Sequence, residues 1–456
     1  MSTIAAISTA VGIGGIGIIR LSGKDSFEIV KKIYIPKNKK LFNQIKGYSI
    51  SYGTININKQ TVDEVLVSFF VAPRSYTTEN MCEIQCHGGN QVMKKILEAL
   101  LKNGAVLAEP GEFTKRAFMN GRIDLLQAES VIDVINAKSE REVQAGINQL
   151  EGYLSKEISD IKQEILNVMI NIEVEIDYPE YEMEETTIKQ IKEMLDSIKI
   201  KIEKLEKSFD NGKIIKEGIK TAIIGKPNAG KSSLLNKLLK EDRAIVTEFE
   251  GTTRDTIEEM VNINGIPLKL VDTAGIRDAK DEVERIGIKK SREMAQNADL
   301  IIAIFDGSKY LDKEDYEILS LLEGKNCIIL LNKCDLVSKL NAKDKQLLKY
   351  TDKIVEISAL NGFGIDILED AITELFNLDK IKFDTEVVIT NVRHKTLLSQ
   401  AINNISNAED TIIKKMPLDI IAIYIKEILE NLGTISGELV SEDIIDEIFS
   451  KFCLGK

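Results

Sequence analysis

The chain has 456 residues, of which 43% are hydrophobic and 29% charged, and it carries a net charge of −12. This length predicts two to four domains, and the acidic balance argues against a protein that coats nucleic acid by charge alone. The apolar runs are far shorter than the roughly 20 residues of a membrane span. Five cysteines in a chain of this length favour a reducing, cytoplasmic setting over a disulfide framework.

Residues 1–120 are predicted to form a mixed α/β domain. Short apolar runs at 16–19 and 65–71 alternate with turn residues, and 92–101 has helical spacing. This part carries 15 Lys and Arg against 9 Asp and Glu. A basic surface is suited to an anionic ligand, although an ordinary solvated surface would give the same count.

Helical spacing prevails from Arg122 to about Phe209 and returns after about Leu378. One predicted helix has apolar residues at every third or fourth position: Ile188, Ile191, Leu195, Ile198, Ile202 and Leu205. The acidic stretch 177–185 contains a proline and predicts a loop between two long helices. Because helical segments flank the region between them, we predict that this region is inserted into a helical domain.

Between about residues 218 and 378 the sequence alternates between strand and helix patterns, which is typical of a parallel sheet. The predicted strands are 219–224, 268–271, 300–305, 328–331 and 354–357. A Gly-x-x-x-x-Gly-Lys-Ser motif at 225–232 directly follows the first strand. Its glycines let backbone N–H groups approach phosphates, Lys231 is expected to contact the β- and γ-phosphates, and Ser232 is expected to bind magnesium. The other residues of this phosphate loop are Asn228, Ala229, Gly230 and Ser233.

Two further segments are expected to surround the γ-phosphate. Thr253, in the Gly-Thr-Thr-Arg-Asp sequence at 251–255, is predicted to bind magnesium. The second segment directly follows an apolar strand and consists of Asp272, Thr273, Ala274 and Gly275. The Asp272 carboxylate is expected to bind magnesium through water, and the Gly275 N–H is expected to contact the γ-phosphate.

Guanine is expected to be selected by the segment that follows the fourth strand. It contains Asn332, Lys333 and Asp335, and the Asp335 carboxylate can accept both guanine N–H groups, a pairing that adenine cannot match. The sequence 358–360 follows the fifth strand and is predicted to back the base with Ser358, Ala359 and Leu360. Together these motifs predict a multidomain α/β protein that binds and hydrolyses GTP, with a P-loop G domain inserted in an α-helical domain. The predicted boundaries are 1–120 for the N-terminal domain, 121–214 for the first part of the helical domain, 215–379 for the inserted G domain and 380–456 for the second part of the helical domain.

The residue after Gly275 is Ile276, where Ras-type enzymes carry a glutamine that orients water. Hydrolysis must therefore be assisted by other groups. Asn228 offers a side-chain oxygen that could hold a monovalent cation, and the acidic residues at 281–284 could orient water. The same acidic residues could equally form a solvated helix start, and the residues alone leave both interpretations open.

The chain resembles the MnmE (also TrmE) family of tRNA modification GTPases over essentially its whole length. The segments that carry the resemblance are 14–23, Cys-His-Gly-Gly at 86–89, Pro-Gly-Glu-Phe-Thr-Lys-Arg-Ala-Phe at 110–118, 124–129, 281–287 and the terminal Cys-Leu-Gly-Lys at 453–456. This resemblance implies a folate-binding N-terminal α+β domain that forms a homodimer, a discontinuous helical domain and an inserted G domain. It also implies a potassium-activated GTPase that works with an FAD-dependent partner (MnmG, or GidA) on carbon 5 of the wobble uridine of certain tRNAs.

The resemblance also implies roles for individual residues. Glu284 becomes the catalytic residue that orients water, and Cys453 becomes a candidate for catalysis near the folate. The predicted potassium ligands are Asn228, Thr247, Phe249 and Thr252, with Thr247 also at the nucleotide. Reduced folate (5-formyl- or 5,10-methylene-tetrahydrofolate) is expected to contact Arg20, Glu79, Arg122 and Lys456. The family often has lysine where Arg122 stands, which keeps the charge and changes the donor geometry.

One alternative function keeps the same nucleotide motifs. A GTPase switch in ribosome or complex assembly would need no chemistry in the flanking domains. The terminal Cys-x-Gly-Lys and the N-terminal folate-type segment favour tRNA modification.

Overall fold

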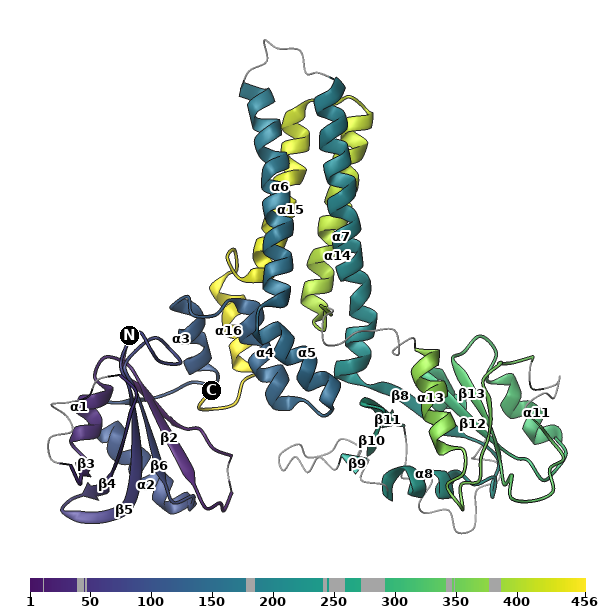
Figure 1. Cartoon of the computed structure of the whole chain (residues 1–456), viewed down its shortest axis with the longest axis horizontal. Helices are drawn as coiled ribbons and strands as arrows, with labels where there is room; N and C mark the ends of the chain where they lie inside the picture. The colour runs from purple at the N-terminus through teal and green to yellow at the C-terminus, as the bar shows by residue number, and fades with distance from the viewer. Residues whose placement is uncertain are drawn as a thin grey trace. The chain divides into compact units, whose positions relative to one another are not determined.

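The computed structural model describes residues 1–10, 12–38, 45, 47–177, 185–240, 244–245, 259–271, 292–341, 347, 349–376 and 387–456. The chain forms two compact units (Figure 1). The first comprises 1–132, 149–191 and 407–456, and the second comprises 133–148 and 192–406. The architecture is multidomain α/β, as the sequence predicts, with an N-terminal sheet domain, a helical domain and a second α/β domain that carries a parallel sheet. The four predicted domain boundaries stay predictions.

The N-terminal domain of the first unit is a seven-stranded sheet in the order β3-β4-β5-β6-β2-β1-β7. Its elements are β1 (Ile4–Ile7), β2 (Gly17–Ser22), α1 (Ser26–Lys31), β3 (Tyr34–Pro36), β4 (Ser49–Ile57), β5 (Gln60–Phe70), β6 (Met81–Cys86), α2 (Asn90–Lys102), β7 (Val106–Leu107) and α3 (Glu112–Met119). All neighbouring strands are antiparallel except β1 and β7. Alternate residues of the strands, such as Val65 and Val67, are buried against α1 and α2 and form the core of this domain.

Long helices make up the helical domain, which the chain enters before the second sheet and re-enters after it (Figure 1). They are α4 (Leu125–Asn136), α5 (Glu140–Leu150), α6 (Tyr153–Asp177), α7 (Glu185–Glu217), α14 (Val392–Ile413), α15 (Leu418–Ser436) and α16 (Glu442–Ser450). In the first unit α6 packs along α15, with Ile158, Ile165 and Ile425 fully buried. Among the described residues no helix is both long and apolar enough to cross a membrane.

The second unit contains a seven-stranded sheet in the order β14-β13-β12-β8-β11-β10-β9. Its elements are β8 (Ile219–Ile224), α8 (Lys231–Lys240), β9 (Ala244–Ile245), β10 (Glu259–Ile263), β11 (Ile266–Leu270), β12 (Leu300–Asp306), α11 (Lys313–Ser320), β13 (Cys327–Asn332), β14 (Ile354–Glu356) and α13 (Ile365–Leu375). The five strands from β14 to β11 are parallel, and β10 and β9 continue the sheet in antiparallel fashion. Apolar side chains on both faces of the parallel strands are buried, as expected for a sheet that helices cover on both sides.

The five strands predicted for this sheet are confirmed, with ends that shift by at most two residues. The predicted apolar stripe of α7 is confirmed from Ile191 onward, but Ile188 is 37% exposed. It lies in the first turn of the helix. Of the acidic loop predicted at 177–185, residues 178–184 lie outside the described residues, and Asp177 and Glu185 are the ends of α6 and α7.

Neighbouring segments approach two glycines of the second unit closely. Gly212 of α7 lies so near the chain before α14 that a Cβ there would be 2.0 Å from the carbonyl oxygen of Ile389. The neighbouring Ser208 hydroxyl accepts a hydrogen bond from the N–H of Ile389 at 3.0 Å. In the β10–β11 turn, a Cβ at Gly265 would lie 3.1 Å from the Arg141 side chain, so this glycine leaves room for the arginine.

Candidate functional site

The first site lies in the second unit, where the carboxyl ends of parallel strands meet at one edge of the sheet. β8 leads into the phosphate loop, β13 ends at Asn332, and β14 leads into the loop that begins at Ser358. Ligands of open parallel sheets bind at this edge. The sheet therefore brings together three of the predicted nucleotide-binding segments.

The phosphate loop connects β8 to α8, so its N–H groups lie at the start of a helix. Lys231 turns back over the loop, and its ammonium group donates hydrogen bonds at 2.7 Å to the carbonyl oxygens of Gly225 and Lys226. Burial lowers the pKa of Lys231, so a phosphate anion beside it would favour the charged form. Asn228 is exposed with a left-handed backbone (φ 59°), and Ser232 and Ser233 are exposed in the first turn of α8.

Asn332 is a clamp between the phosphate loop and the base-binding loop. Its side chain is only 3% exposed. The amide nitrogen donates to the carbonyl oxygen of Ala229 at 2.7 Å, and the amide oxygen accepts from the N–H of Ala359 at 2.9 Å. A Cβ at Gly230 would lie 2.0 Å from the Asn332 amide nitrogen. The glycine is thus required by the clamp as well as by the approach of a phosphate.

Lys333 and Asp335, two residues of the predicted guanine-binding segment, have different surroundings. Lys333 has a left-handed backbone (φ 67°), and its ammonium group pairs with Asp306 at 2.7 Å. Asp335 is exposed. Its carboxylate is therefore open to the two N–H groups of a guanine base. Ala359 is buried and Leu360 is 82% exposed in the loop that Asn332 holds.

Several predicted residues of this site lie outside the described residues: Thr247, Phe249, Thr252, Thr253, Asp272, Thr273, Ala274, Gly275, Ile276 and Glu284. Their roles at magnesium, potassium, the γ-phosphate and the attacking water stay predictions.

The second site lies in the first unit, where the C-terminus returns to the N-terminal domain. The Ser8 hydroxyl and the Arg20 guanidinium both donate to the carbonyl oxygen of Gly455, at 3.0 and 3.2 Å. The carbonyl oxygen of Lys456 accepts from the N–H of Phe113 at 3.1 Å. The C-terminal segment thus lies against the N-terminal domain.

Gly455 fits this place because it has no side chain. Its φ is +83°, and a Cβ would lie 2.4 Å from the carbonyl oxygen of Ile7. Cys453 and Leu454 are exposed, whereas Phe452 is buried beside α3 and α16. The tail is thus anchored on both sides of an accessible Cys453 thiol.

Two of the predicted cations of this site, Arg20 and Arg122, lie beside one aromatic ring. The Arg122 guanidinium lies 4.5 Å and that of Arg20 lies 5.7 Å from the centre of the Tyr76 ring. Arg20 is also paired with Glu83 at 2.8 Å, so its charge is already balanced in part. Arg122 is exposed, and it is the more available of the two for an anion.

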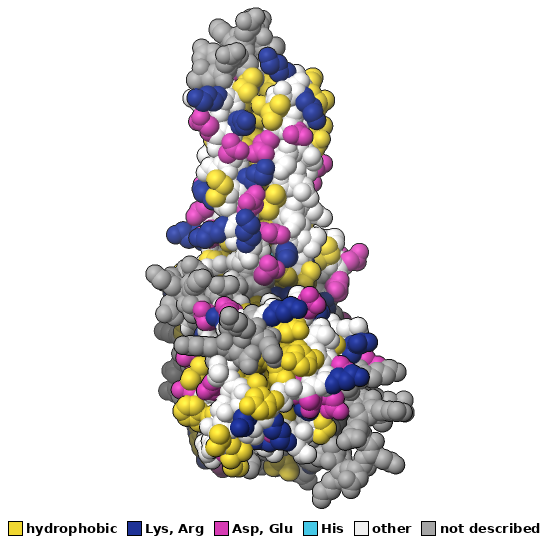
Figure 2. All heavy atoms as spheres, turned by 90° about the vertical axis from the view of Figure 1, so that its right-hand side faces the viewer, with side chains coloured by type: hydrophobic (Ala, Val, Ile, Leu, Met, Phe, Trp, Pro, Cys, Tyr) yellow, Lys and Arg dark blue, Asp and Glu magenta, His cyan; other side chains and the backbone are white. Residues whose placement is uncertain are grey.

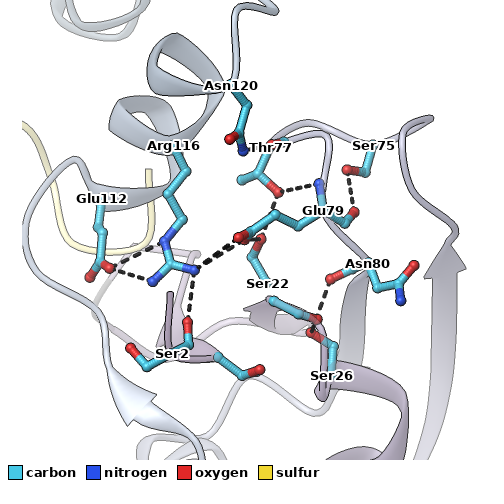
Figure 3. A network of polar contacts seen from close by, with 12 residues as sticks. Ser2, Ser22, Ser26, Ser75, Thr77, Glu79, Asn80, Glu112, Arg116 and Asn120 are labelled. Carbon is cyan, nitrogen blue, oxygen red and sulfur yellow. Dashed lines mark hydrogen bonds and ion pairs between the residues drawn. The ribbon is translucent and has the colours of Figure 1, made fainter.

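Glu79 belongs to a polar network that Figure 3 shows from close by. Its carboxylate accepts from the Ser22 hydroxyl at 2.6 Å and from the Arg116 guanidinium at 3.1 and 3.3 Å. Sequence analysis missed Arg116, Tyr76 and Ser8. Arg116 and Tyr76 lie within a few residues of Arg122 and Glu79, but nothing in their spacing signals these contacts.

Comparison with known proteins shows which family this chain resembles. The description "MnmE helical domain" matches residues 125–453, and "GTP-binding protein TrmE N-terminus" matches residues 3–122. The chain is 50% identical to the tRNA modification GTPase MnmE of Acetivibrio thermocellus and 48% identical to that of Clostridioides difficile, in each case over 100% of this chain and 99% of the relative. Among solved structures, the G domain of the T. maritima FeoB iron transporter matches 34% of this chain and 98% of its own at 25% identity, with a TM-score of 0.25, too low to support an argument.

Proposed function

Because this chain belongs to the MnmE (TrmE) family, we propose that it hydrolyses GTP as part of tRNA modification. The observation that carries the GTPase assignment is the Asn332 clamp, which joins the phosphate loop to the base-binding loop beside an exposed Asp335. In this proposal Lys231 contacts the β- and γ-phosphates, which replace the two carbonyl oxygens that its ammonium group contacts in the structure. Ser232 and Thr253 would hold the magnesium ion, which neutralises charge on the phosphates.

Asp335 gives this assignment its sharpest test. Adenine leaves the carboxylate without its two N–H partners, so the preference for GTP over ATP is expected to be on the order of 10⁴. Asp335→Asn should shift the preference towards xanthine nucleotides, because the amide donates where the carboxylate accepts. Equal binding of GTP and ATP by the intact protein would refute the assignment.

We propose that potassium activates hydrolysis and that Glu284 orients the attacking water. Two features support this: Ile276 cannot position water by hydrogen bonding, and the exposed Asn228 presents its side chain at the phosphate loop. Hydrolysis should be faster in potassium than in sodium, and Asn228→Ala should abolish the difference while GTP still binds. Glu284→Ala should lower the turnover rate with little change in nucleotide affinity. Equal rates in the two salts would remove the potassium site.

We propose that the second site binds a reduced folate through Arg20, Glu79, Arg122 and Lys456. The glutamate carboxylates of such a ligand need cations, and its pterin N–H groups need an acceptor such as Glu79. Calorimetry with 5-formyl-tetrahydrofolate tests this on the wild type, on Arg122→Ala and on a chain that ends before Cys453. Binding that survives both changes undiminished would place the folate elsewhere.

The chemistry proposed for the folate site is installation of an aminomethyl-type group at carbon 5 of the wobble uridine of certain tRNAs. An FAD-dependent partner of the MnmG (GidA) type would take part, and the folate would supply the one-carbon unit. The exposed thiol of Cys453, held between the anchored Phe452 and Gly455, supports a role in this step. Cys453→Ser should keep GTP hydrolysis and folate binding but lose modification with the partner; full modification would make the thiol a bystander.

We propose that the protein is a homodimer through its N-terminal domain. One face of the sheet is left open by α1 and α2, and it exposes Ile35, Ile50, Tyr52 and Leu66, between 42 and 69% of each. The register pairs Tyr52 with Leu66, and alternation puts the other two on the same face. Leu66→Lys should convert the dimer to a monomer in light scattering, whereas a monomeric wild type would contradict the proposal.

We also propose that tRNA is bound mainly in complex with the partner and that the protein acts in the cytoplasm. Figure 2 shows Lys and Arg side chains interspersed with Asp and Glu on the visible face, without a field of one sign. This face gives little affinity for phosphate backbones by charge alone. Electrophoretic mobility shifts should therefore show much tighter tRNA binding with the partner than without it.

A further inference from the structure

We propose that Arg116 is a positioning residue that aims the Glu79 carboxylate at the pterin of the folate, an inference that rests on the folate site proposed above. Arg116 lies on α3, and its side chain is 5% exposed. No motif of the nucleotide site involves it. It lies between Glu79 and Glu112 and pairs with both carboxylates.

The guanidinium holds three parts of the N-terminal domain together (Figure 3). It donates to Glu112 at 2.7 Å within α3, to the carbonyl oxygen of Ser2 at 2.8 Å, and to both oxygens of Glu79. A planar fork with five donors can make all these bonds at once, and a lysine ammonium group cannot. Arg116 therefore fixes where the Glu79 carboxylate lies.

Hydroxyl groups on the other side of Glu79 fix its orientation further. Ser22 and Thr77 are fully buried, and their hydroxyl oxygens lie 2.6 Å apart. The Ser22 proton is donated to Glu79, so the Thr77 hydroxyl must donate to Ser22. The Thr77 oxygen then remains free to accept the N–H of Glu79 at 3.3 Å. The Glu79 carboxylate, which can only accept, therefore determines the direction of both hydroxyl hydrogen bonds, from Thr77 to Ser22 and from Ser22 to Glu79.

The backbone around Glu79 is tied down as well. Its carbonyl oxygen accepts from the Ser75 hydroxyl at 2.6 Å, and the carbonyl oxygen of Thr77 accepts from the Asn120 amide at 2.7 Å (Figure 3). The Glu79 side chain is 19% exposed, and a carboxylate has about four lone-pair sites. Arg116 and Ser22 together occupy three of these sites, so about one is left, on the Oε1 atom that Ser22 does not contact, and it suits an N–H donor such as one of a pterin ring. Because the surrounding hydrogen bonds already fix the Glu79 side chain, that side chain loses less conformational entropy when the ligand binds.

A double-mutant cycle on the full chain tests this, with calorimetric binding of 5-formyl-tetrahydrofolate as the readout. Arg116→Lys keeps a positive charge in the buried network, and it should weaken folate binding about three- to tenfold. In a Glu79→Gln background the same change should alter affinity by less than about twofold, because Arg116 acts through Glu79. GTP affinity, measured on the same samples, should stay at the wild-type value.

Glu112→Gln is the matched control, since it weakens the other ion pair of Arg116 and leaves Glu79 untouched. A purely structural role for Arg116 predicts that Glu112→Gln and Arg116→Lys weaken folate binding alike, and that Arg116→Lys is equally harmful with or without Glu79. Either result overturns the proposal while the folate site stands. If the wild type binds no folate, the folate site and the proposal fall together.

Discussion

Replacing Asn332 with alanine should damage the phosphate loop and the base-binding loop together. The side chain makes two buried hydrogen bonds, to the carbonyl oxygen of Ala229 at 2.7 Å and from the N–H of Ala359 at 2.9 Å. Each lost bond, with its buried partner left unpaired, costs about 1–2 kcal/mol. Asn332→Ala should therefore lower the free energy of unfolding of this domain by about 2–4 kcal/mol. Because GTP needs both loops in place, its affinity should fall about 30-fold or more.

The assay is the dissociation constant of a fluorescent GTP analogue, with thermal unfolding of the same samples. Asn332→Asp is informative because it keeps the acceptor for Ala359 but turns an oxygen towards the oxygen of Ala229, so it should be at least as harmful. Asn361→Ala is the matched control, since Asn361 is exposed in the loop that Asn332 holds. Wild-type affinity and wild-type unfolding of Asn332→Ala would refute the idea that this side chain joins the two loops.

Three other predictions concern backbone contacts and thiols. Gly212→Ala should destabilise the protein by about 1–3 kcal/mol in denaturant unfolding, because the new Cβ would lie 2.0 Å from the carbonyl oxygen of Ile389. Gly455→Ala should detach the tail, since its φ of +83° costs alanine about 1–2 kcal/mol; folate binding should weaken in calorimetry and GTP hydrolysis should not change. At pH 8 iodoacetamide should label the exposed Cys453 first in peptide mass spectrometry. Cys86 should stay unlabelled in the native protein, because burial, with a smaller contribution from Asp63, raises the pKa of its thiol to about 11.

The parallel sheet could be predicted from the sequence because buried parallel strands form continuous apolar runs. The predicted bounds of β8 agree with the structure at both ends, and those of β12, β13 and β14 agree to within one residue at each end. The phosphate loop and the base-binding segments followed from motifs of fixed spacing, each directly after a strand. What spacing could not provide was the role of Asn332, because the clamp joins carbonyl and N–H groups from segments 103 and 27 residues away.

The second site was less accessible to sequence analysis because its contacts are long-range. Arg20 was predicted to face an anion, but the antiparallel register of β2 and β6 places it opposite Glu83, with which it pairs. Arg116 contacts Ser2 and Glu79, which are 114 and 37 residues away along the chain. Neither the strand order of the N-terminal sheet nor these partners is encoded by local periodicity.

The central claim is that this chain hydrolyses GTP with a site built for guanine. The most direct measurement is phosphate release by the full chain from GTP and from ATP, side by side, with magnesium and potassium present. We expect steady release from GTP and almost none from ATP, and the same assay on Asp335→Asn should show GTP hydrolysis reduced and xanthosine triphosphate hydrolysed instead. Equal release from GTP and ATP, or no release from GTP, would contradict the account.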